Sequence, residues 1–502
     1  MRNCLAIVDF PSVKKFVFGT DRAREIRGAS ALLERLNVVD LPRSLEKEFE
    51  GRIRPVFFSG GAGLFTVESA TPAELDAALE RIDDKIHSAS AGGLHLDWSV
   101  VELGTGAEAF AAANRRAHIL LAGRKGIAKR PRPRERLGVF DECHSCSSPG
   151  VSVRWTEDGQ EEWICGTCKA KRDNRREGRS WRDLAERLGL QGHPEEHRPD
   201  DFSWLAARSI RKGYAGLVYM DGDAMGRVIK SIAHPDHYRV FSKVVDESLR
   251  AAVGKVIGAY REKWRNRRED RLPADVLLLG GDDLVMVTTA DLALPMAIGI
   301  SAEFRSATAS EFSAKGMKIE GLDQKGLTVS AGVAFFKDRQ PFRVVLEQAE
   351  SLLRSAKRAR AEAKADEGFV DFADVSQSRF VALEDVRRIG QGIGSGTELT
   401  CWPRSASRAE AFLESARSVV EAGVTKGRIN QLAAVAGRQL NAGFETRRLI
   451  ARAKRAEQRE ALLRFFESNG MGENPPWAFE GRIRRTAIAD LATLFPHLEA
   501  NP

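Results

Sequence analysis

The sequence predicts an α+β protein with four parts: two domains that share one order of strands and helices, a cysteine-rich module between them, and a C-terminal helical bundle. Three observations predict this class. The order β-α-β-β-α-β-α occurs twice along the 502 residues, two Cys-x-x-Cys pairs separate the copies, and Ala, Leu and Arg dominate after about Asp371. The expected limits of the four parts are 1–123, 124–205, 206–375 and 376–502.

Composition narrows the class of protein. Hydrophobic residues make up 43% of the chain, which is enough for several cores, and the net charge of +8 fits a polyanionic partner without requiring one. Asp9 and Lys14 interrupt the N-terminal apolar stretch, and no run of 18 apolar residues occurs, so we expect no signal peptide, no membrane span and a cytoplasmic protein. The six cysteines are then expected to be reduced, and paired cysteine spacings indicate a metal site rather than disulfides.

The first copy is expected in the N-terminal quarter, where apolar alternation and helical periodicity follow one another. Its expected strands and helices are, in chain order, 2–10, 21–37, 53–58, 64–68, 72–88, 94–102 and 107–122. Thr71 precedes Pro72 and is the predicted N-cap of its helix. The hairpin turn of this copy, Ser59-Gly60-Gly61-Ala62-Gly63, contains no acidic residue.

The second copy repeats the order with a different turn. Its expected elements are 216–220, 237–261, 276–279, 284–287, 291–313, 325–336 and 342–362. Gly280-Gly281-Asp282-Asp283 joins two apolar runs and predicts a tight β-hairpin turn. Packing alone does not explain a duplication in which one copy keeps the acids and the other lacks them. Antiparallel strands with helices on one face indicate a ferredoxin-like, or palm, domain in both copies.

Acidic residues of the second copy are expected to meet at one edge of its sheet. The strand 216–220 runs into Asp221, and in a palm this strand lies beside the hairpin that carries Asp282 and Asp283. Three carboxylates at one point repel each other unless a cation lies between them, and Mg²⁺ or Mn²⁺ takes such oxygen ligands. Asp221, Asp282 and Asp283 are therefore the predicted catalytic metal ligands of a two-metal nucleotidyltransferase. Which of Asp282 and Asp283 lies closer to the metal stays open.

Other residues near these acids are candidates for nucleotide binding. Backbone groups at the start of the following helix can bind phosphate, and glycines let a ligand approach the backbone closely. Lys357 can reach the β- and γ-phosphates, or it is a solvated helix-surface lysine; Ser330 can line the pocket, or it is a small core residue. Asp223 alternates away from Asp221 on an ideal strand. The candidates are Gly222, Asp223, Gly226, Gly280, Gly281, Ser330 and Lys357.

The module between the copies carries Cys143 and Cys146, then 18 residues, then Cys165 and Cys168. Two C-x₂-C pairs at this separation predict a tetrahedral Zn²⁺ site, and four thiolates leave no open position, which indicates a structural role. Basic residues flank the module and are expected either to contact a nucleic-acid backbone or to form a solvated surface. They are Arg124, Lys125, Lys129, Arg130, Arg132, Arg134 and Arg136 before it, and Lys169, Lys171, Arg172, Arg175, Arg176, Arg179 and Arg182 after it.

The C-terminal part is expected to be a helical bundle without a catalytic constellation. Its predicted helices are 406–421, 426–440, 444–469 and 482–494. Its arginine-rich faces fit a solvated surface or a face that docks a protein.

Taken together, these residues resemble the large polymerase-cyclase subunit of type III CRISPR effector complexes. The resemblance lies in the order of a degenerate palm, a Cys₄ insert, a palm with Asp221-Gly222-Asp223-Ala224-Met225-Gly226 and Gly-Gly-Asp-Asp, and a helical domain. It implies synthesis of cyclic oligoadenylates from ATP, assembly with guide RNA and other effector subunits, and activation by target RNA. Many members begin with a nuclease domain bearing adjacent His-Asp. No His-Asp dipeptide occurs here, so we expect a version without that domain and without DNA cleavage.

Three other functions stay open at this point. A diguanylate cyclase would need two chains to bring two GTP molecules together, and its turn usually continues with Phe where this chain has Leu284. A non-enzymatic RNA-binding scaffold would keep the palm fold, but intact acids argue against it. A template-directed polymerase would extend a primer. The sequence decides neither ATP against GTP nor the size of the product ring.

Overall fold

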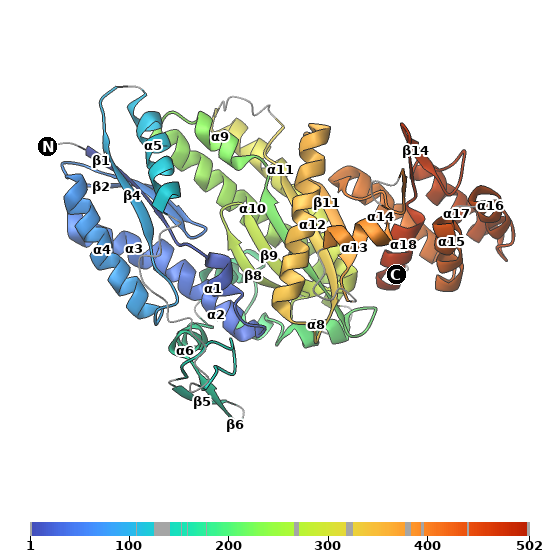
Figure 1. Ribbon diagram of the computed structural model, residues 1–502, viewed down its shortest axis with the longest axis horizontal. Coiled ribbons are helices and arrows are strands. Elements are labelled where there is room, and N and C mark those ends of the chain that lie inside the picture. The colour runs from blue at the N-terminus through green and yellow to red at the C-terminus, as the bar shows by residue number, and fades with distance from the viewer. Residues whose placement is uncertain are drawn as a thin grey trace.

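The computed structural model describes residues 3–106, 108–124, 141–151, 153–157, 159–176, 178–265, 271–317, 325–376, 383–392, 396–438 and 441–498. The first palm lies at one end of an elongated molecule, the second palm lies in the middle, and the C-terminal helices lie at the other end (Figure 1). The cysteine module projects from the first palm (Figure 1). Among the described helices, none has the length and apolar character needed to cross a bilayer.

The first palm is a four-stranded antiparallel sheet in the order β2-β3-β1-β4. Its strands are β1 (Asn3–Asp9), β2 (Ile53–Ser59), β3 (Ala62–Val67) and β4 (Asp97–Leu103). Its helices are α1 (Val13–Val17), α2 (Ala23–Glu34), α3 (Leu41–Phe49), α4 (Pro72–Ala89) and α5 (Ala109–Arg124), with a π-helical stretch at Arg35–Asp40. The predicted N-cap is confirmed, because Thr71 forms a capping box with Glu74. The helix α3 is missing from the prediction, although Pro42 at its first turn is compatible with a helix start.

The second palm repeats the strand order of the first. Its sheet has the order β13-β11-β10-β7-β9-β8, and β10-β7-β9-β8 matches β4-β1-β3-β2 of the first palm. The strands are β7 (Tyr214–Gly222), β8 (Ala274–Gly280), β9 (Asp283–Thr289) and β10 (Val329–Lys337). The helices are α8 (Phe202–Arg208), α9 (Met225–Ser231), α10 (Pro235–Arg265), α11 (Ala290–Ala314) and α12 (Phe342–Ala363). The predicted palm in each copy is thus confirmed.

Two cores run through both palms because the strands alternate. In β1, Cys4 and Ala6 are buried in a core that also holds Leu217 and Tyr219 of β7. The other face of β1 is buried in a second core with the opposite face of β7 and with α10 and α11. The two palms are therefore packed against each other as well as joined by the chain.

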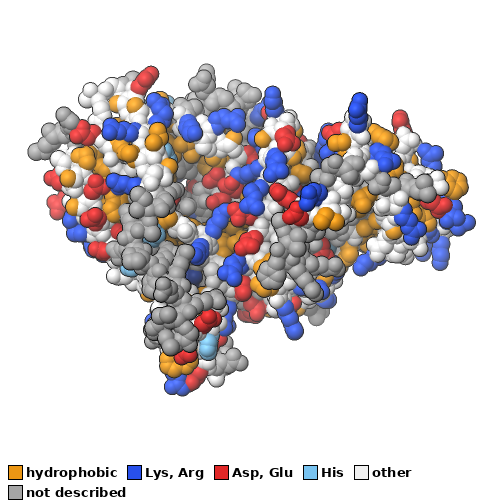
Figure 2. All heavy atoms as spheres, viewed as in Figure 1, with side chains coloured by type: hydrophobic (Ala, Val, Ile, Leu, Met, Phe, Trp, Pro, Cys, Tyr) orange, Lys and Arg blue, Asp and Glu red, His pale blue; other side chains and the backbone are white. Residues whose placement is uncertain are grey.

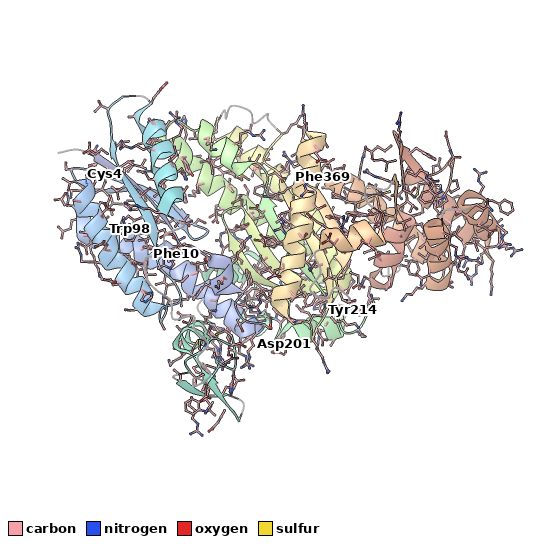
Figure 3. The ribbon with its side chains drawn as sticks, in the orientation of Figure 1. Cys4, Phe10, Trp98, Asp201, Tyr214 and Phe369 are labelled. Atoms are coloured by element: carbon pink, nitrogen blue, oxygen red, sulfur yellow. The ribbon has the colours of Figure 1, made fainter. Side chains whose placement is uncertain are left out.

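The second sheet extends beyond the predicted elements. The strand β11 (Phe369–Asp374) pairs in parallel with β10, and β13 (Arg404–Ser405) pairs with β11. Tyr214 and Phe369, at the starts of β7 and β11, lie toward opposite ends of the sheet, as expected when these strands run in opposite directions (Figure 3). A parallel partner reached through a crossover helix leaves no hairpin signal in the sequence, so this strand was not predicted.

The cysteine module consists of β5 (Val153–Glu157), β6 (Gln160–Ile164) and α6 (Gly166–Asp173), followed by α7 (Arg179–Arg187). The helix α6 packs so closely on α2 that a Cβ atom on Gly28 would lie 1.8 Å from the Lys171 carbonyl oxygen. Two residues of the basic cluster are buried here. Lys171 Nζ donates to the Phe16 carbonyl oxygen at 2.5 Å, and Arg172 pairs with Glu25. Both side chains stabilise the module internally, so their predicted place on a nucleic-acid-facing or solvated surface is wrong. Residues 125–136 of the upstream cluster lie outside the described part of the chain.

The C-terminal part is helical, with an added small sheet. Its helices are α13 (Leu383–Gly390), α14 (Ala406–Glu421), α15 (Lys426–Arg438), α16 (Ala442–Ala451), α17 (Ala456–Ser468) and α18 (Ile488–Leu494). The expected single helix 444–469 is two helices, and the first residues of the expected helix 482–494 form a strand. That strand, β15 (Ile483–Arg485), pairs with β12 (Thr397–Glu398) and β14 (Ala478–Glu480). On the face seen in Figure 2, basic and acidic side chains are interspersed over this part.

Candidate functional site

The acidic hairpin turn of the second palm lies against the glycine turn of the first. The strand β8 ends at Gly280 and β9 begins at Asp283, so Gly281 and Asp282 form a two-residue turn. Gly281 has a φ of 63°, which favours glycine. The Gly280 carbonyl oxygen lies 3.7 Å from the place of a Cβ atom on Gly60. The two turns are therefore neighbours, and the acids lie where the palms meet.

The end of β7 brings a third acid and a lysine to this turn. A Cβ atom on Gly222 would lie 2.5 Å from Asp282 Oδ2, so the absence of a side chain lets Asp282 approach the strand. Lys357 of α12 donates to the Gly222 carbonyl oxygen at 2.7 Å and pairs with the Asp221 carboxylate. The structure thus brings Asp221, Gly222, Asp282 and Lys357 together at one edge of the sheet.

Burial and mutual repulsion control the charge of these acids. Burial, and then the charge of Asp221, raise the pKa of Asp282 to about 6. Burial, and then the charges of Asp221 and Asp282, raise the pKa of Asp283 well above its usual value. Partly buried carboxylates that repel each other in this way favour a bound cation.

The chemistry of the donors fits a divalent cation. Carboxylate and carbonyl oxygens are the hard ligands that Mg²⁺ and Mn²⁺ prefer. The ammonium group of Lys357 contacts the Asp221 carboxylate and the Gly222 carbonyl at once, so a positive charge is already accommodated between these oxygens. Asp221, Asp282 and Asp283 are the residues that would hold the metal.

Two predicted nucleotide-binding residues lie beneath this edge rather than on it. The Ser330 side chain is fully buried, and its hydroxyl lies 2.8 Å from Asp223 Oδ1. Asp223 also accepts from Thr328 Oγ1 at 2.8 Å and pairs with Arg360 at 3.3 Å, while burial raises its pKa. These contacts pin the segment after β7 to β10. A nucleotide contact by Asp223 or Ser330 stays a prediction, and the structure gives both a supporting position.

Gly226 has a different environment. It is the second residue of α9, which follows Ala224 in a left-handed conformation with a φ of 58°. Among the described residues, apart from the chain neighbours of Gly226 and the nearby backbone of its own helix, no atom lies within 4 Å of the place of a Cβ atom on Gly226. This side of the helix start is open, and its predicted contact with nucleotide stays a prediction.

The four cysteines of the module converge as the spacing predicts. Among the described residues, Cys143, Cys146, Cys165 and Cys168 are the one group of three or more potential ligands whose donor atoms all lie within 4.8 Å of one another. The Cys146 and Cys165 sulfur atoms are 3.8 Å apart. Zinc–sulfur bonds of about 2.3 Å give a tetrahedron with edges of about 3.8 Å, so the spacing of the thiols is compatible with a bound Zn²⁺.

Comparison with known families agrees with the geometry of the palm. Residues 214–365 match the family model described as Cas10/Cmr2, second palm domain. The matched stretch contains Asp221, the Gly-Gly-Asp-Asp turn and Lys357. No curated protein matches the chain.

Solved structures share the fold of the whole chain at low sequence identity. A Csm1–Csm4 cassette in complex with cA3 has a TM-score of 0.59 at 14% identity, over 100% of this chain and 70% of that chain. Csm1 in T. onnurineus has a TM-score of 0.57 at 15% identity, over 100% and 70%. A Csm1–Csm4 cassette in complex with one ATP has a TM-score of 0.56 at 16% identity, over 99% and 70%. A further cassette, with cA4, is covered over 54% of its length, so this chain spans between about half and 70% of these solved chains.

The acids of the second palm also lie near a lysine of the first palm, which the sequence analysis did not predict. Lys14 of α1 lies 3.0 Å from Glu350 and 5.0 Å from the ring centre of Tyr219. Its positive charge offsets part of the rise that burial and the neighbouring acids cause in the pKa of Asp283, and the charge of Lys357 does the same for the pKa of Asp282. The acids are thus flanked by one lysine from each palm. No sequence signal marks Lys14, because its place depends on how the palms pack.

Proposed function

We propose that this chain is the large subunit of an RNA-guided type III CRISPR effector, and that its second palm converts ATP into cyclic oligoadenylates. The observation that carries the proposal is the meeting of Asp221, Asp282 and Lys357 at the edge of a Cas10/Cmr2 second palm. Solved Csm1–Csm4 cassettes of the same fold hold cA3 or ATP, which supports an adenine nucleotide as substrate.

In the proposed reaction, the 3′-hydroxyl of one nucleotide attacks the α-phosphate of the next. A phosphodiester bond forms, the bond to the β-phosphate breaks, and pyrophosphate leaves. After several additions, the terminal 3′-hydroxyl attacks the α-phosphate of the triphosphate at the other end of the same chain; the bond to the β-phosphate breaks, a further pyrophosphate leaves, and the ring closes. A bound Mg²⁺ or Mn²⁺ would lower the pKa of the attacking hydroxyl and neutralise charge on the triphosphate.

The residues of the site have separate roles in this proposal. Asp221, Asp282 and Asp283 hold the metal, and Lys357 binds the β- and γ-phosphates. Glycines of the site bring backbone groups close to the nucleotide, while Asp223 and Ser330 support the strand ends. The proposed nucleotide-contacting glycines are Gly222, Gly226, Gly280 and Gly281.

The remaining proposals, a structural metal and the macromolecular partners, are also based on the similarity to type III CRISPR effector subunits. Cys143, Cys146, Cys165 and Cys168 hold a structural Zn²⁺, since four thiolates leave no open coordination position. Guide RNA, target RNA and further effector subunits are the proposed partners of the palms and the helical part.

Product analysis tests the proposal directly. The purified protein is incubated with ATP or GTP and Mg²⁺, with and without co-purifying RNA, and the products are identified by mass spectrometry. We expect cyclic oligoadenylates from the wild type and none from Asp282→Ala with Asp283→Ala. Glu460→Ala, in an exposed ion pair with Arg464, is the matched control and retains activity. Cyclic di-GMP as the main product, primer-dependent linear products, or unchanged turnover in the double variant would overturn the proposal.

A further inference from the structure

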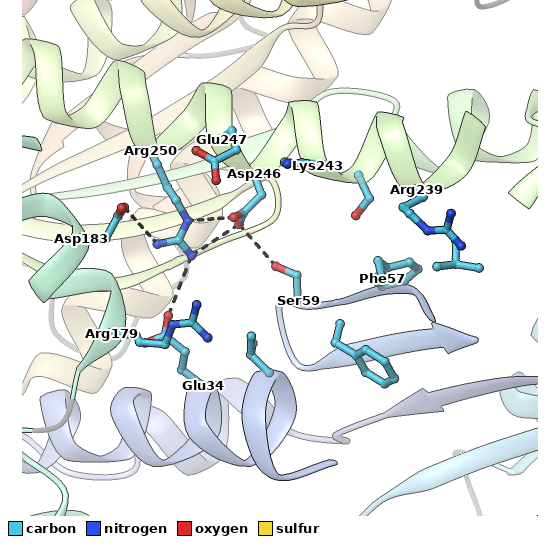
Figure 4. A pocket seen from close by; sticks show the side chains of 14 residues that line it. Glu34, Phe57, Ser59, Arg179, Asp183, Arg239, Lys243, Asp246, Glu247 and Arg250 are labelled. Atoms are coloured by element: carbon cyan, nitrogen blue, oxygen red, sulfur yellow. Dashed lines mark hydrogen bonds and ion pairs between the residues drawn. The ribbon is translucent and has the colours of Figure 1, made fainter. Parts of the chain in front are cut away.

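A polar cavity of about 300 Å³ lies behind the acidic turn, where three parts of the chain meet. The first palm contributes the end of β2, the second palm contributes α10, and α7 closes the side (Figure 4). Charged side chains from these elements point toward one another, and Asp246 and Arg250 of α10 lie at the centre of their contacts (Figure 4). Within the described part of the chain, neither residue forms a hydrogen bond or an ion pair with Asp221, Asp282 or Asp283.

The Asp246 carboxylate contacts both hairpin turns at once. Its Oδ1 atom accepts a hydrogen bond from the Gly281 backbone N–H at 2.8 Å. The Ser59 hydroxyl of the first palm donates to the same atom at 3.4 Å. Its side chain is 23% exposed, so water competes weakly for these contacts. One carboxylate therefore joins the acidic turn to the glycine turn.

Arg250 fixes this carboxylate and the strand that leads into the turn. Its Nε donates to Asp246 Oδ2 at 2.8 Å, and its Nη2 donates to the Leu279 carbonyl oxygen at 3.3 Å. Its Nη1 donates to Ser180 Oγ at 3.1 Å, and that hydroxyl lies 2.7 Å from Glu34 Oε1. The Arg250 side chain is 13% exposed. The contacts run from α10 through α7 to α2, so the strand that leads into the turn is held by neighbouring elements.

The bonded amide lies immediately before Asp282. Holding the Gly281 N–H fixes the peptide plane between Gly280 and Gly281, and the backbone there is already restricted to a conformation that favours glycine. That plane and the dihedral angles of Gly281 set the direction in which the chain enters Asp282. Removing the acceptor would leave the amide without its partner and let the turn take several orientations.

We propose that Asp246 is a positioning residue: it holds the acidic turn in its metal-binding orientation and couples that turn to the first palm through Ser59. This inference rests on the proposed function for its catalytic readout. It gives the first palm, whose hairpin turn carries no acid, a supporting role for the acids of the second palm.

Three variants test the inference: two substitutions of Asp246 and one of the adjacent residue Glu247. Asp246→Ala removes the acceptor, whereas Asp246→Asn keeps an oxygen that can accept from the Gly281 N–H. Glu247→Gln is the matched control, because Glu247 is the next residue of α10, lines the same cavity and pairs with Arg187 instead of the turn. For each variant we measure kcat and KM for ATP, Mn²⁺ binding by calorimetry without nucleotide, and the melting temperature.

We expect Asp246→Ala to lower kcat about tenfold and to weaken Mn²⁺ binding about tenfold. The reason is that the variant loses the one hydrogen bond that orients the acidic turn. Asp246→Asn should recover most of both losses, and Glu247→Gln should match the wild type. A melting temperature within a few degrees of wild type in Asp246→Ala then excludes general unfolding.

Two results would overturn the inference. One is an Asp246→Ala protein that retains wild-type Mn²⁺ binding and kcat while Asp282→Ala is inactive. The other is an equal loss in Asp246→Asn and Asp246→Ala, which would assign the effect to charge instead of the hydrogen bond. If the wild type forms no nucleotide product, the proposed function fails. Mn²⁺ binding then still decides this inference: a loss in Asp246→Ala alone supports it, and equal binding by all variants overturns it.

Discussion

The two palms have one topology and different turns. Both sheets place the hairpin strands on the same side of the first strand, and both turns have two residues between paired strand ends. In the first palm Gly60 and Gly61 both have positive φ values, 60° and 81°, whereas in the second palm Gly281 alone does so within its turn. The palm fold therefore does not require acids in this turn. We infer that the acids of the second palm serve chemistry and not folding.

The strand register sharpens this comparison, because the first palm retains one acid. Asp9 of β1 pairs with Ala62, the first residue after the glycine turn. Continuing the register between β7 and β9 by one residue places Asp221 opposite Asp283, the first residue after the acidic turn. Asp9 therefore has the place of Asp221, while Ala62 has the place of Asp283. Loss of the turn acids, not of the strand acid, distinguishes the first palm.

The largest expected difference between the palms is in catalysis. Asp221→Ala should lower kcat about a thousandfold, because several kcal/mol of transition-state stabilisation are lost with the metal. Asp9→Ala should lower it less than about tenfold, since no turn acid accompanies Asp9 to form a second metal site. Steady-state rates of ATP consumption measure both. Equal losses in two folded proteins would contradict the distinction between a catalytic and a supporting palm.

The next largest effect is a loss of stability on disrupting the cysteine module, whose helix α6 packs on α2 of the first palm. Cys143→Ser removes one ligand, and the melting temperature should fall by about 5–10 °C because metal binding is coupled to folding. Elemental analysis should find about one zinc per wild-type chain and less in the variant. A wild type without zinc, or a Cys143→Ser variant with an unchanged melting temperature, would contradict a structural zinc site at these cysteines.

Placing an acid in the hairpin turn of the first palm should destabilise the protein. A Cβ atom at position 61 would lie 2.8 Å from Val13 Cγ2, in a backbone conformation with a φ of 81°. Gly61→Asp should lower the free energy of unfolding by about 1–3 kcal/mol through strain and the close contact. Gly51→Asp is the control: Gly51 has a φ of 72°, and apart from its chain neighbours no atom of the described residues lies within 4 Å of the place of its Cβ atom. Equal losses in urea unfolding would leave backbone strain as the only cause.

The smallest expected effect is a pH dependence confined to the second palm. The pKa of Asp282 is raised to about 6 in the fold, so the metal-free folded state binds its proton more tightly than the unfolded chain does. Its contribution to stability is therefore present at low pH and lost as pH rises between about 4 and 6. Asp282→Asn should raise the free energy of unfolding by about 1–2 kcal/mol at pH 7.5 without metal, and by much less at pH 4. With saturating Mn²⁺ at pH 7.5, the wild type should instead be more stable than Asp282→Asn. Thermal melts of both proteins measure this.

Much of the fold could be predicted because its signals are local. The capping box at Thr71, the hairpin around Gly281 and the two cysteine pairs each depend on residues a few positions apart. The helix 406–421 was predicted to the residue, as α14. The strand β11 and the division between α16 and α17 escaped prediction, because a parallel partner and a short break in a helical pattern depend on what packs against them.

The candidate site divides in the same way. Asp221, Asp282 and Lys357 were predicted from their motifs and are brought together by the sheet. Ser330 and Asp223 were predicted beside the nucleotide, and burial places them beneath the strand ends. Burial depends on the layers above and below a strand, which its own sequence does not specify.

The sequence by itself determined the duplicated palm, the cysteine module and the acids of the second turn, because periodicity, turn chemistry and ligand spacing act over short distances. Only the tertiary structure decided that Lys14 flanks the acids, that Asp246 joins the two turns, and that Asp9 has the place of Asp221. Each of these depends on sheet register or on contacts between elements far apart in the chain. Such contacts arise from the packing of two palms around shared cores, and no local pattern of residues encodes them.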